Sequence, residues 1–338
     1  MIERRERRMT SVGSAWRSNS APEDAHPRTR TDMNSISLKI GTRGSPLALA
    51  QAGEVRALLA RAHGCDLERF EIVVIRTSGD MIQDRALAEA GGKGLFTKEI
   101  DAAMLIGEID VAVHSAKDLP TVLPEGIVAA GYLPREDVRD ALISTRADTI
   151  AGLPRGGTLG TASLRRQAQV KRLRPDLEVG LLRGNVETRL GKAERGEIDA
   201  TLLAYAGLKR LGLARRATAL LDIETFLPAV GQGAIALTAR TGDAGASSAV
   251  APILDAATAF ALAAERAFLD ALDGSCRTPI AGHARIDSGV VDFRGMVLRA
   301  DGSETFEVRA RGRADEAARL GRSAGLDLSS RLPAGVLP

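Results

Sequence analysis

Aromatic residues and cysteines are scarce in this chain of 338 residues. With seven Phe, two Tyr and one Trp, it offers few rings on which nucleic-acid bases could stack. Its two cysteines cannot build a disulfide framework, and neither is spaced for metal binding with any of the four histidines. We therefore expect a protein of the reducing cytoplasm, with no metal site and no nucleic-acid partner.

Long apolar runs are also lacking. The longest, such as residues 256–264, fall far short of the roughly 18 residues that a membrane-spanning helix needs, so the sequence argues against any membrane association. Residues 1–36 mix Arg, Ser, Pro and acidic residues and contain no apolar core of an export signal. We expect this segment to be a disordered N-terminal extension.

Charge is almost balanced, with 46 Lys and Arg against 43 Asp and Glu and a net charge of +3. Residues 1–36 hold seven Arg and five acidic residues, so the rest of the chain is nearly neutral and does not favour nucleic-acid binding. Of the cations, 39 are Arg and only 7 are Lys. Arg suits two-pronged recognition of carboxylates or phosphates, although genome composition alone also raises its share.

From residue 37 to about 250, short apolar runs alternate with amphipathic segments, which is typical of an α/β protein with largely parallel sheets. We expect a helix at 47–62 that begins at the N-cap Ser45 and ends at Gly64. A strand at 109–113 should deliver polar residues at its carboxyl end, where such folds bind ligands.

Two strings repeat along the chain in the same order. A Gly-Thr turn before a capped helix occurs at 41–42 and 160–161, and Gly-Glu-Ile-Asp precedes a strand at 107–110 and 196–199. Duplication explains both repeats better than chance, and two similar lobes would enclose a cleft. After residue 250, an Ala-rich helix and three strand-like runs, the last two joined by an Asp-Gly hairpin signal at 301–302, predict a small α+β unit with an antiparallel sheet.

The string HSAKDLP at 114–120 places several polar side chains at the end of a predicted strand. Asp118 is the obvious acid or base, and a turn-capping role is an equally good interpretation of this segment alone. No Gly-x-Ser-x-Gly elbow surrounds Ser115, which argues against a serine hydrolase.

Arginines recur beside predicted helix starts in both lobes. Free backbone amides at a helix start favour anions, and guanidinium groups add two-pronged carboxylate binding. Each one alone is also consistent with an ordinary surface residue, but five together indicate a ligand with several negative charges. They are Arg43 near the cap Ser45, Arg165 and Arg166 after the cap Ser163, and Arg183 and Arg189 around the cap Asn185.

Three further strings contain glycine. GGKGLF at 91–96 lacks the hydroxyl residue and the preceding strand of a phosphate loop, and is better interpreted as a mobile lid carrying Lys93 and Lys98. GQGA at 231–234 is better interpreted as a hinge than as a dinucleotide fingerprint. Cys276 follows Gly-Ser and precedes Arg277, a setting that favours an exposed thiolate, although most lone cysteines are simply buried.

Together these strings resemble the porphobilinogen deaminase family of tetrapyrrole biosynthesis over about residues 38–335. One string would be weak, but eight in the family's order are specific. The departures are small; Ala162, where the family often has Ser, removes one hydroxyl from a predicted binding turn. The matching strings lie at 42–48, 91–99, 114–120, 160–167, 182–190, 206–212, 228–234 and 272–279.

The resemblance implies a transferase that joins four porphobilinogen molecules head to tail, releasing ammonia and, after hydrolysis, hydroxymethylbilane. It implies a dipyrromethane cofactor attached to Cys276 by a thioether, with Asp118 protonating the leaving amine and stabilising the cationic azafulvene. Each pyrrole carries an acetate and a propionate, which suits arginines on both lobes. By this resemblance Lys117, Ser163, Arg165, Arg166 and Arg189 bind the cofactor, Arg43, Ser45 and Arg183 bind substrate, and Lys93 and Lys98 belong to the lid.

The implied fold is α/β, with two lobes resembling type II periplasmic binding proteins and a small α+β C-terminal domain with an antiparallel sheet. We expect the extension at 1–36, lobe 1 at 37–133 and 229–252, lobe 2 at 134–228, and the cofactor-carrying domain at 253–338. We also expect a cytoplasmic monomer whose small-molecule partner is porphobilinogen.

Two other classes of protein stay open on the sequence. A non-catalytic solute-binding protein would share the two lobes, but it normally needs an export signal. An Arg-rich nucleic-acid binder would lose affinity steeply as salt rises.

Overall fold

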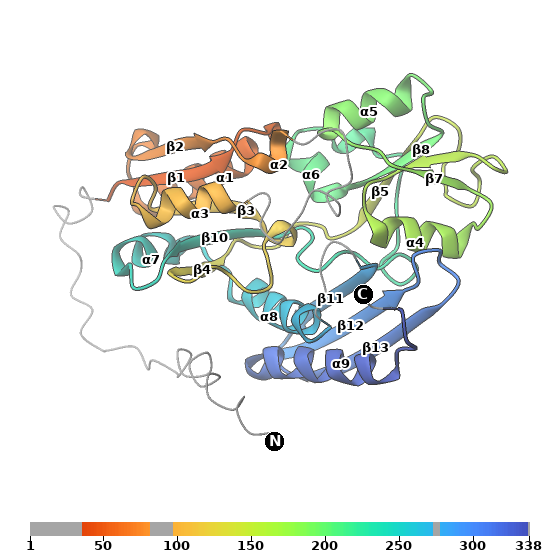
Figure 1. The fold of residues 1–338 in the computed structure, drawn as a ribbon. Coiled ribbons are helices and arrows are strands. Elements are labelled where there is room, and N and C mark those ends of the chain that lie inside the picture. Colours follow the sequence, from red (N-terminus) through yellow and green to blue (C-terminus); the bar gives the residue numbers. More distant parts are fainter. Residues whose placement is uncertain (1–35, 82–96, 273–277, 337–338) are drawn as a thin grey trace. The chain divides into compact units, whose positions relative to one another are not determined.

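The computed structural model describes residues 36–81, 97–272 and 278–336, which contain three β-sheets and their helices (Figure 1). Lys93, Cys276 and nearly all of the expected extension at 1–36 lie outside the described residues. Among the described residues, two sheets have five strands each and the third has three.

The first sheet has the strand order β2-β1-β3-β10-β4. β2, β1 and β3 run parallel, whereas β10 is antiparallel to both of its neighbours. The strands are β1 (Leu38–Arg43), β2 (Phe70–Ile75), β3 (Val111–Ser115), β4 (Ile127–Tyr132) and β10 (Ile235–Arg240), and the helices in this part of the chain are α1 (Pro46–His63), α2 (Ser78–Met81), α3 (Lys98–Leu105) and α7 (Ala244–Val250).

Helix α1 begins and ends where the sequence predicts. The Ser45 side chain accepts a hydrogen bond from Ala48 N at 3.3 Å, and Pro46 occupies the first helical position. Gly64 ends the helix in the left-handed conformation, with φ of 60°. Val55, fully buried, belongs to the core that α1 shares with the sheet.

The second sheet has the order β7-β6-β8-β5-β9. β7, β6 and β8 are parallel, and β5 is antiparallel to both β8 and β9. The strands are β5 (Asp140–Ser144), β6 (Thr158–Gly160), β7 (Glu178–Gly180), β8 (Ala200–Ala204) and β9 (Ala219–Leu220), and the helices are α4 (Leu164–Leu173), α5 (Val186–Glu194) and α6 (Tyr205–Arg210).

The repeated Gly-Glu-Ile-Asp string makes the same contact in both sheets. Asp110 Oδ2 accepts a hydrogen bond from Lys39 N at 2.8 Å, which ties the start of β3 to β1. Asp199 Oδ2 accepts one from Thr158 N at 2.7 Å, which ties the start of β8 to β6. The two sheets therefore share strand order and local contacts, as the internal repeat predicts.

The expectation of largely parallel sheets holds for four strands of each five-stranded sheet, and one strand in each, β10 or β5, runs in the opposite direction. The chain leaves the first sheet after β4, enters the second at β5 and returns to the first at β10. Neighbouring strands that follow each other in the chain are parallel when a helix connects them. A strand that enters from another sheet has no such connection to its neighbour and can run in the opposite direction. β5 and β10 accordingly run antiparallel to β8 and β3.

The third sheet is antiparallel, in the order β11-β12-β13, and α8 and α9 pack together against it (Figure 1). The sequence did not predict α9, because glycines weaken a helical pattern. Here a Cβ on Gly321 would collide with Ala264 O, so glycine allows α9 to approach α8 closely. The elements are α8 (Ala256–Ala271), β11 (Ile280–Asp287), β12 (Val290–Leu298), β13 (Thr305–Arg313) and α9 (Ala317–Arg331).

The C-terminal unit shares buried side chains with the first sheet and with helix α4 of the second lobe. Leu262 of α8 packs in a cluster with Tyr132 of β4 and Ala236 of β10. Met296 of β12 packs in another cluster with Ala168 of α4. The predicted fold class, two α/β lobes and a C-terminal α+β unit with an antiparallel sheet, is confirmed.

Within the described residues, no single helix has both the length and the apolar character needed to cross a membrane. One bent pair, Ala244–Ile253 with Ala256–Ala271, meets those criteria jointly, with a bend of 110° between its halves.

Candidate active site

The carboxyl end of β3 carries the polar string, as predicted. β3 ends at Ser115 and continues into a 3-10 turn, Ala116–Asp118, on which the Asp118 side chain is exposed. The returning chain packs closely against this turn, because a Cβ on Gly231 would lie 2.9 Å from the Lys117 backbone N. Gly231 also has φ of 75°, so the GQGA string provides a close backbone approach; its hinge role stays a prediction.

A small cavity is lined by residues of β1, α1 and β3, together with their flanking turns. Three predicted residues are part of its lining: Arg43, Ser45 and Asp118. Gln51 of α1 also lines it, and its Nε2 donates a hydrogen bond to Ser115 Oγ at 3.0 Å. The sequence signal for Gln51 was only a polar residue on a helix otherwise rich in apolar positions.

His114 lines the same cavity but is neutral at physiological pH. Burial, together with repulsion from Arg43, lowers the pKa of His114 to about 4. Its Nε2 lies 3.2 Å from Thr238 Oγ1 of β10. Asp118 is therefore the better candidate for proton transfer in this lining.

In the second lobe, helix α4 presents two adjacent arginines at its first turn. Ser163 is the N-cap, as predicted, and its Oγ accepts from Arg166 N at 3.4 Å. Both guanidinium groups are almost fully buried and form ion pairs with one carboxylate, Asp140, at 2.8 Å for Arg165 and 2.6 Å for Arg166. Asp140 was not predicted from the sequence, where its signal was a run of charges, REDVRD at 135–140, directly before an apolar strand.

The other two arginines predicted to bind ligand in this lobe lie at the start of helix α5. Its N-cap Asn185 accepts a hydrogen bond from Thr188 N at 2.8 Å. Arg189 Nε donates to Gly184 O at 2.9 Å, which fixes the guanidinium beside the helix start. Arg183 lies just before the cap and is half-buried.

These cations form a cluster that includes residues of both lobes. The pKa of Lys117 is lowered to about 8, chiefly by burial; Asp118 and Asp140 oppose this shift, and Arg166 and Arg165 add to it. Burial also lowers the pKa of Arg189 to about 10, with Arg166 and Arg183 repelling its charge and Asp118 opposing. We call Lys117, Arg165, Arg166, Arg183 and Arg189 the basic cluster. Among the described residues, Asp118 and Asp140 are the carboxylates that act on Lys117, and Asp118 is the one that acts on Arg189.

Of the three remaining predicted residues, the structure describes only Lys98. Lys98 is exposed at the first position of α3 and is not part of the cavity lining. Lys93 and Cys276 lie outside the described residues. Across the described ranges, no group of three or more His, Cys, Asp or Glu side chains is arranged to hold a metal ion.

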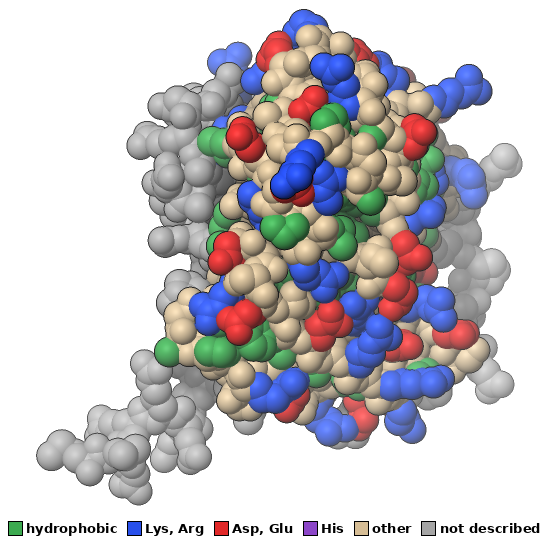
Figure 2. Space-filling model, turned by 90° about the vertical axis from the view of Figure 1, so that its right-hand side faces the viewer, with side chains coloured by type: hydrophobic (Ala, Val, Ile, Leu, Met, Phe, Trp, Pro, Cys, Tyr) green, Lys and Arg blue, Asp and Glu red, His purple; other side chains and the backbone are tan. Residues whose placement is uncertain are grey.

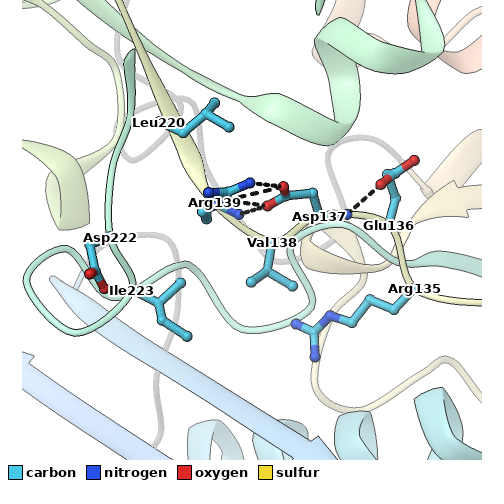
Figure 3. Close-up of a pocket in the computed structure, with 8 residues that line it drawn as sticks. All are labelled: Arg135, Glu136, Asp137, Val138, Arg139, Leu220, Asp222 and Ile223. Atoms are coloured by element: carbon cyan, nitrogen blue, oxygen red, sulfur yellow. Dashed lines mark hydrogen bonds and ion pairs between the residues drawn. The ribbon is translucent and has the colours of Figure 1, made fainter.

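A larger cavity beside the connections between the lobes is a weaker candidate (Figure 3). Four of the five charged side chains in its lining form ion pairs, and the fifth, Asp222, accepts a hydrogen bond from Glu224 N. Asp137 pairs with Arg139 at 2.6 Å, and Glu136 pairs with Lys209 at 2.6 Å. Arg135 pairs with Glu265 at 2.6 Å. This cavity therefore offers little charge to an incoming ligand.

Solved structures with similar arrangements include a periplasmic substrate-binding protein of an ABC transporter from Coxiella burnetii. It is 13% identical, with a TM-score of 0.42, over 64% of this chain and 91% of its own. A putative methionine-binding lipoprotein from Bacillus subtilis is 14% identical, with a TM-score of 0.40, over 65% of this chain and 90% of its own.

Family models and curated relatives are more specific. The family model described as "Porphobilinogen deaminase, dipyromethane cofactor binding domain" matches residues 38–248, and the C-terminal domain of the same family matches residues 259–330. A porphobilinogen deaminase from Nitrobacter winogradskyi is 58% identical over 89% of this chain and 95% of its own length. One from Nitrobacter hamburgensis is 58% identical over 86% of this chain and 92% of its own. The chain belongs to the porphobilinogen deaminase family.

Proposed function

We propose that this chain carries out the reaction of its family at the site described above, with Asp118 as the catalytic acid and base. As a member of that family it is a transferase of tetrapyrrole biosynthesis, and it joins porphobilinogen molecules on a dipyrromethane cofactor. One observation supports the residue roles above all others: the exposed carboxylate of Asp118 acts on two cations, Lys117 and Arg189, whose pKa values are lowered by burial and by neighbouring arginines.

The residues present fit a ligand with several carboxylates. Cations in a poorly hydrated site repel each other, which lowers their pKa values. An anion that binds among them reduces this repulsion and stabilises their charged forms. A dipyrromethane carries an acetate and a propionate on each of its two rings. Lys117, Arg166 and Arg189 would hold these groups, with Ser163 and Arg165 beside them. When bound, the cofactor would supply the pyrrole carbon to which the methylene of the first substrate is joined.

Asp118 performs the proton transfers on the substrate. Its carboxyl group donates a proton to the substrate amine as the carbon–nitrogen bond breaks, so that the electron pair leaves with ammonia. The resulting carboxylate balances the positive charge left on the substrate pyrrole and its methylene. It then accepts the proton released from the pyrrole ring after the new carbon–carbon bond has formed, which returns the acid for the next cycle.

Incoming porphobilinogen binds in the small cavity of the first lobe. Arg43 and Ser45 line this cavity together with Asp118, so a substrate carboxylate held there lies near the catalytic group. Arg183 of the second lobe would hold a further substrate carboxylate, and Lys93 and Lys98 would belong to a lid.

The covalent link of the cofactor is a thioether to Cys276, and its test is the intact mass of the purified chain. The mass should exceed that of the polypeptide by two deaminated pyrrole units, and peptide mapping should place the addition on Cys276. Cys276→Ser should lack it, whereas the matched control Cys65→Ser should keep it. An unmodified Cys276 in active enzyme, or the addition on Cys65, would contradict the assignment.

The remaining expectations are part of the same proposal. The membership of β10 in the first sheet and of β5–β9 in the second supports lobe boundaries near residues 134 and 228, and the C-terminal sheet supports one near 253. We propose a cytoplasmic monomer, which sedimentation of the purified chain would test.

Nucleic-acid binding is disfavoured as an alternative function. On the face shown in Figure 2, basic and acidic side chains are intermingled rather than segregated into a basic stripe. DNA affinity that falls steeply with salt would support this alternative instead.

A further inference from the structure

Asp140, a buried carboxylate, lies next to the basic cluster. It is the first residue of β5 and is fully buried. Its Oδ1 accepts hydrogen bonds from Arg166 Nε at 2.9 Å and from Arg166 Nη2 at 2.6 Å. Its Oδ2 forms an ion pair with Arg165 Nη1 at 2.8 Å. One carboxylate therefore holds two neighbouring arginines of the cluster.

Backbone carbonyl groups also accept hydrogen bonds from both guanidinium groups, while Arg165 Nε is buried without a hydrogen-bond partner. Arg166 Nη1 donates to Leu202 O at 2.9 Å, and Arg165 Nη1 donates to Leu227 O at 2.8 Å. The Arg165 guanidinium also lies 5.8 Å from the ring centre of Phe226. Only 5% and 7% of the two arginine side chains are exposed, so neither has room to turn toward solvent.

Two adjacent buried cations need a counter-charge to stay together. Burial and the neighbouring Arg166 both lower the pKa of Arg165, and Asp140 opposes them. The two arginines in turn hold the pKa of Asp140 well below its usual range, although burial alone would raise it. Without this carboxylate, repulsion and desolvation would drive at least one guanidinium out of its place.

Main-chain hydrogen bonds hold Asp140 in place. Asp140 pairs with Ala204 in the ladder between β5 and β8, and its carbonyl accepts from Leu221 N at 2.8 Å. Five residues earlier, Arg135 is held by the buried Glu265 of the C-terminal unit. The backbone that carries the carboxylate is thus tied to β8, to the segment after β9 and, five residues earlier, to the C-terminal unit.

We propose that Asp140 is a positioning residue for the family reaction, because it holds Arg165 and Arg166 in the orientation that meets the carboxylates of the cofactor and the growing chain. Being fully buried, Asp140 acts through these arginines rather than on the ligand itself. This inference rests on the proposed function.

The test compares three variants with the parent chain. Asp140→Glu keeps the charge but shifts the carboxylate by one methylene, and Asp140→Asn keeps the shape but removes the charge. Asp199→Asn is the matched control, because Asp199 also accepts hydrogen bonds within the second sheet but lies at the opposite end of its strands. The measurements are the thermal midpoint, the share of folded protein that carries the pyrrole addition, and KM and kcat for porphobilinogen.

A positioning role predicts that folded Asp140→Glu has a KM raised about tenfold or more, and a smaller share of loaded protein, with a thermal midpoint near that of the parent. Asp140→Asn should be impaired further in both. Asp199→Asn should lower the thermal midpoint while KM stays within about twofold of the parent.

If Asp140→Asn does not fold, Asp140→Glu decides alone. A KM and a loaded share within about twofold of the parent in Asp140→Glu would overturn the positioning role, because charge compensation alone would then suffice. Failure of the proposed function is distinguishable from this result, since the parent itself would then release no ammonia from porphobilinogen. That outcome would also overturn the proposal for Asp140.

Discussion

Arg135 and Glu265 form a buried ion pair that joins three parts of the chain. Arg135, in the segment that leaves the first sheet, donates from Nη1 and Nη2 to the two carboxylate oxygens of Glu265, at 2.6 and 3.1 Å. Glu265, on α8 of the C-terminal unit, also accepts from Gly231 N at 2.7 Å, in the segment that returns to the first sheet. Both connections between the lobes are therefore held at one carboxylate.

Removing the charge of Glu265 should destabilise the fold strongly. In Glu265→Gln, Arg135 would stay buried without a counter-charge, which should lower the free energy of unfolding by roughly 3–5 kcal/mol. Urea unfolding measures this loss. The control is Glu304→Gln, which removes an exposed pair with Arg299 and should cost about 1 kcal/mol or less. Equal losses in the two variants would show that the buried pair has no special role.

The pKa of Lys117 predicts slower cofactor assembly in alkaline solution. Without an anion bound, this pKa is about 8, so the ammonium loses its proton as the pH rises through 8. Only the protonated form attracts carboxylates. The rate at which apoenzyme gains the pyrrole addition, followed by intact mass, should therefore fall above pH 8, by up to about tenfold per pH unit.

Lys117→Arg is the control for this pH dependence. Arginine keeps its charge throughout the range, so the variant should show a flatter profile above pH 8. A profile that is equally steep in the variant and the parent would assign the pH dependence to another group.

Arg189 should contribute to cofactor retention. In Arg189→Leu, a carboxylate of the cofactor would lose a charge-assisted partner in a partly buried site, at a cost of about 2–5 kcal/mol. Intact mass should show a reduced share of loaded protein in the folded variant. Arg195→Leu removes an exposed arginine from the end of the same helix and should leave this share unchanged. A fully loaded Arg189→Leu protein would refute the role.

The first 33 residues should be dispensable. Their apolar residues are few and scattered among charged and polar ones, so deleting residues 1–33 should leave turnover unchanged. Deleting residues 1–43 removes β1, which pairs with both β2 and β3, and should abolish folding. Circular dichroism and ammonia release measure the two outcomes, and loss of turnover in the shorter deletion would show that the segment takes part in the fold or the reaction.

Local signals in the sequence predicted the helix starts that carry the site. Ser45, Ser163 and Asn185 each cap a helix with their own side chain, and such a contact lies within three residues of the cap. The placement of Asp118 at the end of β3 followed in the same way from the apolar run before it.

Contacts between distant segments could not be predicted in this way. Asp140 and Arg166 are 26 residues apart, and their pairing depends on how β5 and α4 are packed. The antiparallel course of β5 and β10 depends on the chain crossing between sheets twice, which no local pattern records. The residue roles taken from family resemblance, including those of Lys93 and Cys276, stay predictions.

The most direct test of the account is ammonia release from porphobilinogen by Asp118→Asn, measured on holoenzyme matched to the parent in cofactor content. Asparagine keeps the shape of the side chain but neither donates the proton nor balances the cation. The account predicts a rate lower by at least about 10²–10⁴-fold, with a smaller loss in Asp118→Glu, which keeps the charge. A rate for Asp118→Asn within a few-fold of the parent would contradict the catalytic assignment and return Asp118 to the role of a turn cap.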